Sequence, residues 1–150
     1  MDPHKLAMRH SSKDATWRTP PAMVEKLAIA FPFAIDLAAT KESSVQGLPW
    51  LGPGSAYPDA LAVDWHILEP GCGFLNPPYS ISLIKALREQ LAVRLLQNAI
   101  ESEQQLIKAH YAKLIAALRI ENWAKKAYEE SLQGFTTIGV FPYAPQTKWF

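Results

Sequence analysis

The sequence predicts an α/β fold in one domain, and three observations lead to that prediction. Short apolar runs at residues 33–40 and 73–75 are bounded by polar, Gly or Pro residues, as buried strands are. Residues 79–133 contain neither Gly nor Pro and are rich in strong helix formers. The chain has 150 residues, of which 49% are hydrophobic, enough for one substantial core. Helices alternating with apolar strands indicate an α/β sheet.

The N-terminal half predicts a helix, a strand and a long loop. In TWRTPPAMVEKLAIAF, Thr19 is a candidate cap, two prolines suit the first turn, and apolar residues recur at helical spacing. FAIDLAAT (33–40) then reads as a buried strand that turns into a loop. The Gly- and Pro-rich segment 46–60 predicts a loop, and LAVDWHIL (61–68) and GFL (73–75) are the next strand candidates.

The helical stretch is too long to be one rod. Roughly 55 residues of helix would reach about 80 Å, whereas a domain of this size has a radius of gyration of about 15 Å. We therefore expect two or three helices, with a capping box at Ser102 and Gln105 and a helix N-cap at Asn122.

An apolar stripe inside this stretch predicts a helical hairpin or a short coiled-coil seam. Core packing is the favoured interpretation, and a partner-binding face, including self-association through these helices, is the alternative. The stripe consists of Ile107, Tyr111, Leu114 and Leu118. After it, Gly134 ends the last helix and residues 136–141 read as a strand.

Charge and composition limit the classes of function. The net charge is +1 and 19% of the residues are charged, so a nucleic-acid partner would have to meet local basic patches. No apolar run is long enough to span a bilayer, and the N-terminus lacks the apolar core of a signal peptide, so cytoplasm is the expected location. Cys72 has no disulfide partner in the chain. We predict no metal site, because the histidines lack ligand spacing: His4, His10, His66 and His110.

The segment GFLNPPYS (73–80) is the strongest functional signal. Two adjacent prolines end any regular element, so Asn76 and Tyr79 are held rigidly at the tip of the strand that precedes them. The carboxyl edge of an α/β sheet is where such folds bind ligands. A proline-stiffened turn is the structural alternative.

Asn76, Pro77, Pro78 and Tyr79 match in full the fourth motif of the amino-directed, S-adenosylmethionine-dependent methyltransferases, which the chain resembles. More narrowly, it is similar to the small phage-type DNA N6-adenine methyltransferases over nearly its whole length. Three further segments carry this resemblance: Trp17, Thr19 and Pro20 (W-x-T-P), Asp36, Ala38 and Ala39 (D-x-A-A), and Thr147, Trp149 and Phe150 (T-x-W-F).

The resemblance implies a Rossmann-like methyltransferase sheet in a single domain over residues 1–150. It implies S-adenosylmethionine as cofactor, double-stranded DNA as partner, no metal, and adenine N6 as the methylated atom. It also implies a phage or prophage protein in the cytoplasm of a bacterial host, with protection of DNA from restriction as a common role.

The chemistry of adenine explains why the motif residues would be catalytic. The exocyclic amine donates its lone pair into the ring and is a poor nucleophile. If the Asn76 side-chain oxygen and the Pro77 carbonyl each accept one amine hydrogen, the lone pair is localised and aimed at the methyl group. Pro78 stiffens the turn, and Tyr79 offers a face for the flipped base.

The predicted cofactor-binding residues come from the resemblance. Asp36 would lie at the loop that receives S-adenosylmethionine, with contacts from Trp17, Thr19 and Pro20. The Gly-x-Gly that usually follows the first strand is absent, so Ala38 and Ala39 would have to allow the close backbone approach. Asp59 and Asp64 are candidates for polar contacts to adenine or cofactor, and each could equally be a solvated loop acid.

Two departures from the family pattern add expectations. Residues 82–121 look like a helical insertion; the stretch from Lys85 to Lys126 has eight basic and four acidic residues, so it could touch DNA phosphates, although solvated helix faces are the commoner fate of such charges. The chain ends at TKWF, where the family adds strands, so a C-terminal truncation is expected. Two rival functions stay open: an amino-methyltransferase acting on RNA or a protein glutamine, and a non-catalytic scaffold used for binding.

Overall fold

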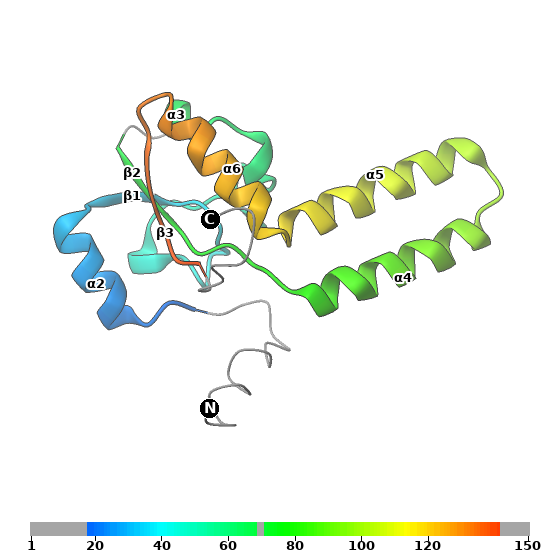
Figure 1. The fold of residues 1–150 in the computed structure, drawn as a ribbon, viewed down its shortest axis with the longest axis horizontal. Helices are drawn as coiled ribbons and strands as arrows, with labels where there is room; N and C mark the ends of the chain where they lie inside the picture. The colour runs from blue at the N-terminus through cyan, green and yellow to red at the C-terminus, as the bar shows by residue number, and fades with distance from the viewer. Residues whose placement is uncertain (1–17, 69–70, 142–150) are drawn as a thin grey trace, which may run out of the picture. The chain divides into compact units, whose positions relative to one another are not determined.

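The computed structural model describes residues 18–68 and 71–141 (Figure 1). The chain divides into two compact units. Of the described residues, the sheet unit comprises 18–68, 71–77 and 120–141, and the hairpin unit comprises 78–119.

The sheet unit is built on three parallel strands in the order β1-β2-β3 (Figure 1). Their bounds are Phe33–Asp36 for β1, Cys72–Leu75 for β2 and Thr136–Gly139 for β3. All four residues of the central strand β2 are buried, as expected for a parallel strand covered on both faces. The parallel sheet with helical connections confirms the predicted α/β class.

Three of the four predicted strands are present: β1 lies in the run at 33–40, β2 includes residues 73–75, and β3 lies in the segment 136–141. Among the described strands β3 pairs only with β2, so it lies at one side of this sheet. The strand predicted at 61–68 is wrong. A 3-10 turn, η2 (Ala60–Ala62), and the short helix α3 (Trp65–Leu68) occupy this segment.

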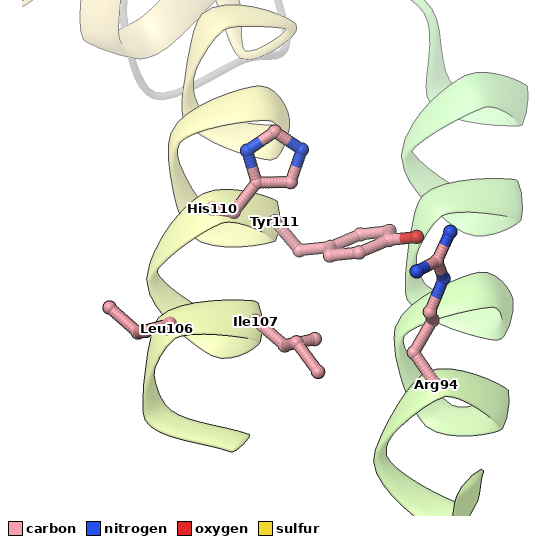
Figure 2. Close-up of a pocket in the computed structure, with 5 residues that line it drawn as sticks. All are labelled: Arg94, Leu106, Ile107, His110 and Tyr111. Carbon is pink, nitrogen blue, oxygen red and sulfur yellow. The ribbon is translucent and has the colours of Figure 1, made fainter. Parts of the chain in front are cut away.

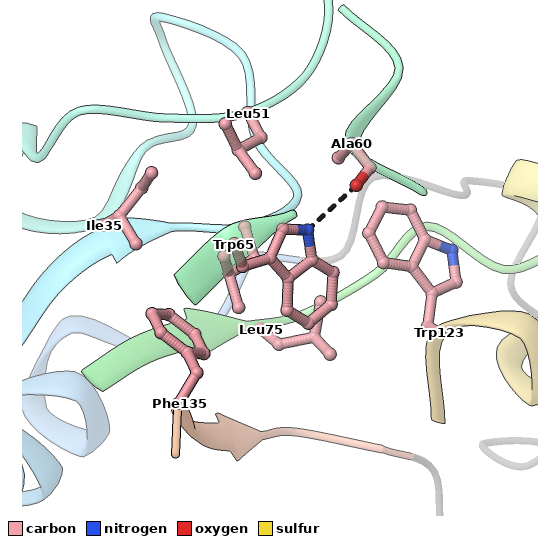
Figure 3. Close-up of a cluster of buried hydrophobic side chains, with 8 residues drawn as sticks. Ile35, Leu51, Ala60, Trp65, Leu75, Trp123 and Phe135 are labelled. Carbon is pink, nitrogen blue, oxygen red and sulfur yellow. Dashed lines mark hydrogen bonds between the residues drawn. The ribbon is translucent and has the colours of Figure 1, made fainter. Parts of the chain in front are cut away.

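The reason for this error is visible in the core (Figure 3). Trp65 is 1% exposed, and its indole N–H donates a hydrogen bond of 2.8 Å to the Ala60 carbonyl. That bond needs a compact turn over residues 60–65, which an extended strand cannot form. Trp65 also stacks near Trp123 of α6 (Ile120–Ser131) and meets Phe135 edge-on, with ring centroids 6.5 and 6.3 Å away.

Helix α2 (Pro21–Ala30) confirms the helix predicted before β1. Val24 anchors it in the core at 3% exposure. The predicted cap at Thr19 is wrong: the N-cap position is Pro20, and no side chain caps the helix. The Thr19 hydroxyl instead accepts a hydrogen bond from the Asn76 side chain.

A buried carboxylate ties α3 to α6 within the sheet unit. Glu130 is 2% exposed, and its Oε2 accepts from the His66 backbone N–H at 3.0 Å and lies 2.7 Å from His66 Nδ1. Its Oε1 lies 2.5 Å from Lys126 Nζ. Burial alone would raise the pKa of Glu130, but hydrogen bonds from Lys126, His66 and the Trp65 backbone outweigh it and lower the pKa to about 2. His66 thus takes part in the contact that joins α3 to α6.

The hairpin unit contains α4 (Ile81–Gln97) and α5 (Glu101–Ala117), which run antiparallel and pack along their length (Figure 1). With α6 in the sheet unit, they confirm the prediction that residues 79–133 form two or three helices. The predicted helical hairpin is confirmed. Of the apolar stripe, Ile107 and Tyr111 of α5 and its C-cap residue Leu118 are half-buried. Leu114 is 40% exposed, and Ile115 is half-buried beside it.

The predicted helix caps in this region are wrong. Helix α5 begins at Glu101, and Asn98 stabilises its start by accepting from the Ile100 N–H at 3.2 Å and donating to Glu103 at 2.7 Å. Helix α6 begins at Ile120, before Asn122. Ser80 caps α4 by accepting from the Leu83 N–H at 3.2 Å. In the described residues no helix is long and apolar enough to cross a membrane.

Replacing Glu130 with Gln tests the tie between α3 and α6. The pKa of Glu130 falls from the ordinary 4.5 to about 2 on folding, so its contribution is present above pH 4.5 and is lost as the pH falls through about 2. We expect E130Q to lower the free energy of unfolding by roughly 3 kcal/mol at pH 7. Urea unfolding at pH 7 and pH 2.5 measures this difference.

The matched control is Glu129→Gln on the same helix, because the Glu129 side chain is 52% exposed and forms only a surface pair with Lys125 at 3.7 Å. We expect E129Q to change the free energy by less than about 0.5 kcal/mol. An E130Q effect as small as that of E129Q, or one equally large at pH 7 and pH 2.5, would show that the Glu130 charge does not hold the two helices.

Candidate active site

The carboxyl edge of the sheet brings Asp36 and Asn76 to adjacent strand ends. Asp36 is the last residue of β1 and pairs with Phe74 of β2, while Asn76 follows directly after β2. On its other side, Asp36 is bridged to Trp50: the Asp36 N–H donates to the Pro49 carbonyl and the Leu51 N–H donates to the Asp36 carbonyl, both at 2.9 Å. The segment around Trp50 thus extends this edge beyond β1.

The Asp36 side chain holds the loop that follows β1. Asp36 is 3% exposed, and its Oδ1 accepts from the Ala38 N–H at 3.3 Å while its Oδ2 accepts from the Val45 N–H at 3.0 Å. Burial raises the pKa of this carboxyl, and the two backbone bonds oppose that change only in part. Both carboxylate oxygens are therefore engaged in shaping residues 37–45.

A glycine outside the D-x-A-A segment supplies the close backbone approach at this loop. Gly52 has a φ of 134°, and a Cβ there would lie 2.3 Å from the Ala39 carbonyl oxygen. The Ala39 N–H donates to the Leu51 carbonyl at 3.0 Å, which fixes the two segments together. This contact between two chain segments differs from the close approach predicted at Ala38 and Ala39, which concerns the cofactor and stays a prediction. The sequence signal for the contact was Gly52 within the Gly- and Pro-rich loop.

Asn76 is oriented by a residue far away in the sequence. Its side-chain Nδ2 donates a hydrogen bond of 3.1 Å to the Thr19 hydroxyl, which precedes α2. Pro77, immediately after Asn76, is among the fully buried side chains. The side chain on which the predicted chemistry depends is thus held by β2 before it, by Pro77 after it and by Thr19 beside it.

The other predicted site residues are placed as follows. Asp64 is not bonded to Thr19, Asp36 or Asn76; its 62% exposed side chain contacts Lys126 Nζ at 3.5 Å. Asp59 is half-buried and precedes η2 without capping it. Pro20 is the N-cap residue of α2, beside Thr19. Pro78 and Tyr79 belong to the hairpin unit, so their part in the site stays a prediction. Trp17, Thr147, Trp149 and Phe150 lie outside the described residues.

The hairpin unit has a pocket of its own (Figure 2). It has a volume of about 230 Å³ and contains none of the motif residues. Its lining consists of Arg94, Leu106, Ile107, His110 and Tyr111. We place the candidate active site at the sheet edge and not here, because the Asn-Pro-Pro sequence and the buried acid lie at the edge. Within residues 18–68 and 71–141, no three His, Cys, Asp or Glu side chains gather as metal ligands would.

The fold and the edge together define a class: an α/β protein whose parallel sheet presents a buried acid and an Asn-Pro-Pro sequence at neighbouring strand ends. The family model described as DNA N-6-adenine-methyltransferase (Dam) matches residues 7–147. The chain belongs to this family of DNA adenine methyltransferases. Comparisons with curated proteins and with solved structures found no match.

Asp36→Asn tests the role of the buried carboxylate. The amide keeps only one acceptor oxygen, so either the Ala38 or the Val45 N–H loses its partner and faces another donor. We expect at least one of these two amides to exchange with deuterium about ten times faster than in the wild type, as measured by NMR. The control is Asp59→Asn, since Asp59 caps no helix. Unchanged protection at both amides in D36N would show that the carboxylate does not hold the loop.

Proposed function

We propose that the protein transfers a methyl group from S-adenosylmethionine to N6 of an adenine in double-stranded DNA. The family match supports DNA adenine methylation, and one observation carries the proposal at the level of residues: Asn76 stands at the end of the central strand with its amide anchored on Thr19. A methyltransferase sheet of the Rossmann-like kind is part of this proposal. So is a single catalytic domain over residues 1–150 with residues 82–121 as an insertion.

Asn76 and Pro77 prepare the nucleophile in this proposal. The Asn76 Oδ1 and the Pro77 carbonyl each accept one hydrogen of the adenine amine, so that its lone pair leaves conjugation and points at the methyl carbon. The nitrogen would form a bond to that carbon as the carbon–sulfur bond breaks, so that the sulfur leaves as the neutral thioether S-adenosylhomocysteine. The methylated amine, now positively charged, would then give one proton to solvent water. Tyr79 stacks on the adenine after it leaves the duplex, which offsets part of an unstacking cost of a few kcal/mol.

The loop after β1 is the proposed cofactor-binding segment. When bound, S-adenosylmethionine supplies a methyl group activated by its sulfonium. Ala38 and Ala39 carry no side-chain atoms beyond Cβ, and the backbone from Ala38 to Val45 is fixed by the Asp36 carboxylate, so a ligand can approach a shaped main chain there. Asp36 would act by holding the loop in shape, because both of its oxygens already accept backbone N–H groups. Trp17, Pro20, Asp59 and Asp64 remain proposed contributors.

Asn76→Ala tests the proposed chemistry. We expect wild-type protein to transfer label from S-adenosylmethionine to adenine N6 of unmethylated double-stranded DNA, and N76A to lose about 100-fold or more of the rate, because one of two groups polarising the amine is gone. Gln133→Ala, an exposed residue of the same unit, is the control and should keep the wild-type rate. Circular dichroism confirms that the variants are folded.

Two outcomes of the same assay would contradict the proposal. Label transferred preferentially to RNA or to a protein glutamine would favour the other amino-methyltransferases. Folded wild-type protein that neither transfers label nor binds S-adenosylmethionine by calorimetry would favour a non-catalytic scaffold.

The charge distribution supports the hairpin unit as a source of phosphate contacts. Residues 80–119 carry six basic and three acidic side chains, whereas the described residues of the sheet unit, 18–68, 71–77 and 120–141, carry five basic and eight acidic. The net charges are therefore +3 and −3. A negative sheet unit repels phosphates, so we propose that α4 and α5 supply much of the attraction to DNA.

Neutralising hairpin cations tests this assignment. Arg88 and Lys108 are exposed, on α4 and α5, and we expect the double variant R88Q/K108Q to bind a DNA duplex more weakly. The slope of log K against log salt concentration should fall by about 1 for each lost phosphate contact. The control is Lys26→Gln, exposed on α2. If K26Q lowers the salt dependence and R88Q/K108Q does not, the phosphate contacts come from the sheet unit and the proposal for α4 and α5 is wrong.

A further inference from the structure

We propose that Thr19 is a positioning residue of the methyl transfer and acts through the Asn76 amide. This inference rests on the proposed function and assigns Thr19 a side-chain role. Its basis is the 3.1 Å hydrogen bond from Asn76 Nδ2 to the Thr19 hydroxyl, made across 57 positions of sequence. The bond links the segment before α2 directly to the end of the central strand.

Both partners of this bond have a restricted backbone. Thr19 precedes Pro20 and Asn76 precedes Pro77, and a residue before proline is confined to extended conformations. Each is also attached to a well-packed element. Thr19 leads through Pro20 into α2, which Val24 anchors at 3% exposure, and Asn76 follows Leu75 at 0% exposure. The hydrogen bond therefore joins two rigid points and leaves the Asn76 amide little freedom to turn.

The direction of the bond fits the chemistry proposed for Asn76. The nitrogen and oxygen of an amide point to different sides of the group, so holding Nδ2 on Thr19 fixes where Oδ1 lies. An amide turned over by half a rotation would aim an N–H at the adenine amine, which also donates. Two donors facing each other would oppose the lone-pair localisation that the transfer needs. Thr19 thus favours the orientation in which Oδ1 accepts.

The test compares Thr19→Val with Thr19→Ser in steady-state methyl transfer. Valine keeps the shape of threonine and removes the hydroxyl, whereas serine keeps the hydroxyl. We expect T19V to lower kcat about 10- to 100-fold and to leave the dissociation constant for S-adenosylmethionine within about threefold of the wild-type value. We expect T19S to retain most of the wild-type kcat. An effect of T19V on cofactor affinity alone would overturn the inference and favour a cofactor contact.

A double-mutant cycle with Asn76→Ala separates positioning from a general structural effect. If Thr19 acts through the amide, T19V should not lower further the rate of N76A. Equal losses in both backgrounds would overturn the inference. An unchanged kcat in T19V would also overturn the inference, because the hydroxyl would then have no role in the transfer. So would an increase of kcat, because it would show that the Thr19 hydroxyl donates to Oδ1 and competes with the substrate amine.

A readout independent of activity is the side-chain N–H₂ signal of Asn76 in a nitrogen-15 NMR spectrum. We expect T19V to shift this signal and speed its exchange with solvent, and T19S to leave it near its wild-type position. An unchanged signal in T19V would overturn the inference. If the wild-type protein transfers no methyl group, the proposed function is wrong. If the wild-type protein is active and T19V leaves kcat unchanged, only the inference about Thr19 is wrong.

Discussion

The parallel pairing of β2 with both of its neighbours is the interaction on which the site depends. Because β1, β2 and β3 run in the same direction, their carboxyl ends share one edge, and Asp36 and Asn76 lie at the ends of neighbouring strands. Because β2 is the central strand, all four of its residues are buried, and this packing holds the backbone in place where Asn76 follows the strand. Gly73 is part of this arrangement: a Cβ there would lie 2.6 Å from the Leu37 side chain.

Rigidity at the edge comes from backbone restriction and from two small sets of hydrogen bonds. Prolines follow both Thr19 and Asn76, and the Asp36 carboxylate closes the loop after β1 through the Ala38 and Val45 N–H groups. Proximity catalysis needs this kind of preorganisation, since a misplacement of about 1 Å can cost about 100-fold in rate. Away from the edge, the Glu130 tie between α3 and α6 stabilises the helices that precede β2 and β3.

Local sequence signals predicted the parts of the structure that local forces decide. Residues without Gly or Pro became helices, the apolar runs at β1 and β2 became strands, and the Asn-Pro-Pro sequence lies at the end of β2. The strand expected at 61–68 failed because a tertiary demand, burial of Trp65 with its indole N–H satisfied, outweighed its apolar pattern. The Thr19 cap failed because α2 begins only at Pro21, so that Pro20 holds the N-cap position, and the Thr19 hydroxyl instead accepts from Asn76. Sequence spacing could predict neither hydrogen bond. Packing of the core determines the bond from Trp65 to Ala60, and 57 positions of sequence separate Asn76 from Thr19.

The edge formed by Asp36, its loop and Asn76 is the proposed binding site of the adenosyl cofactor. The most direct measurement is a titration of nitrogen-15-labelled protein with S-adenosylhomocysteine, followed by NMR. We expect amide shifts to concentrate in residues 36–45 and at Asn76, with smaller changes at the hairpin pocket around Arg94 and His110. Shifts centred on that pocket, or no shifts at millimolar ligand with folded protein, would contradict it.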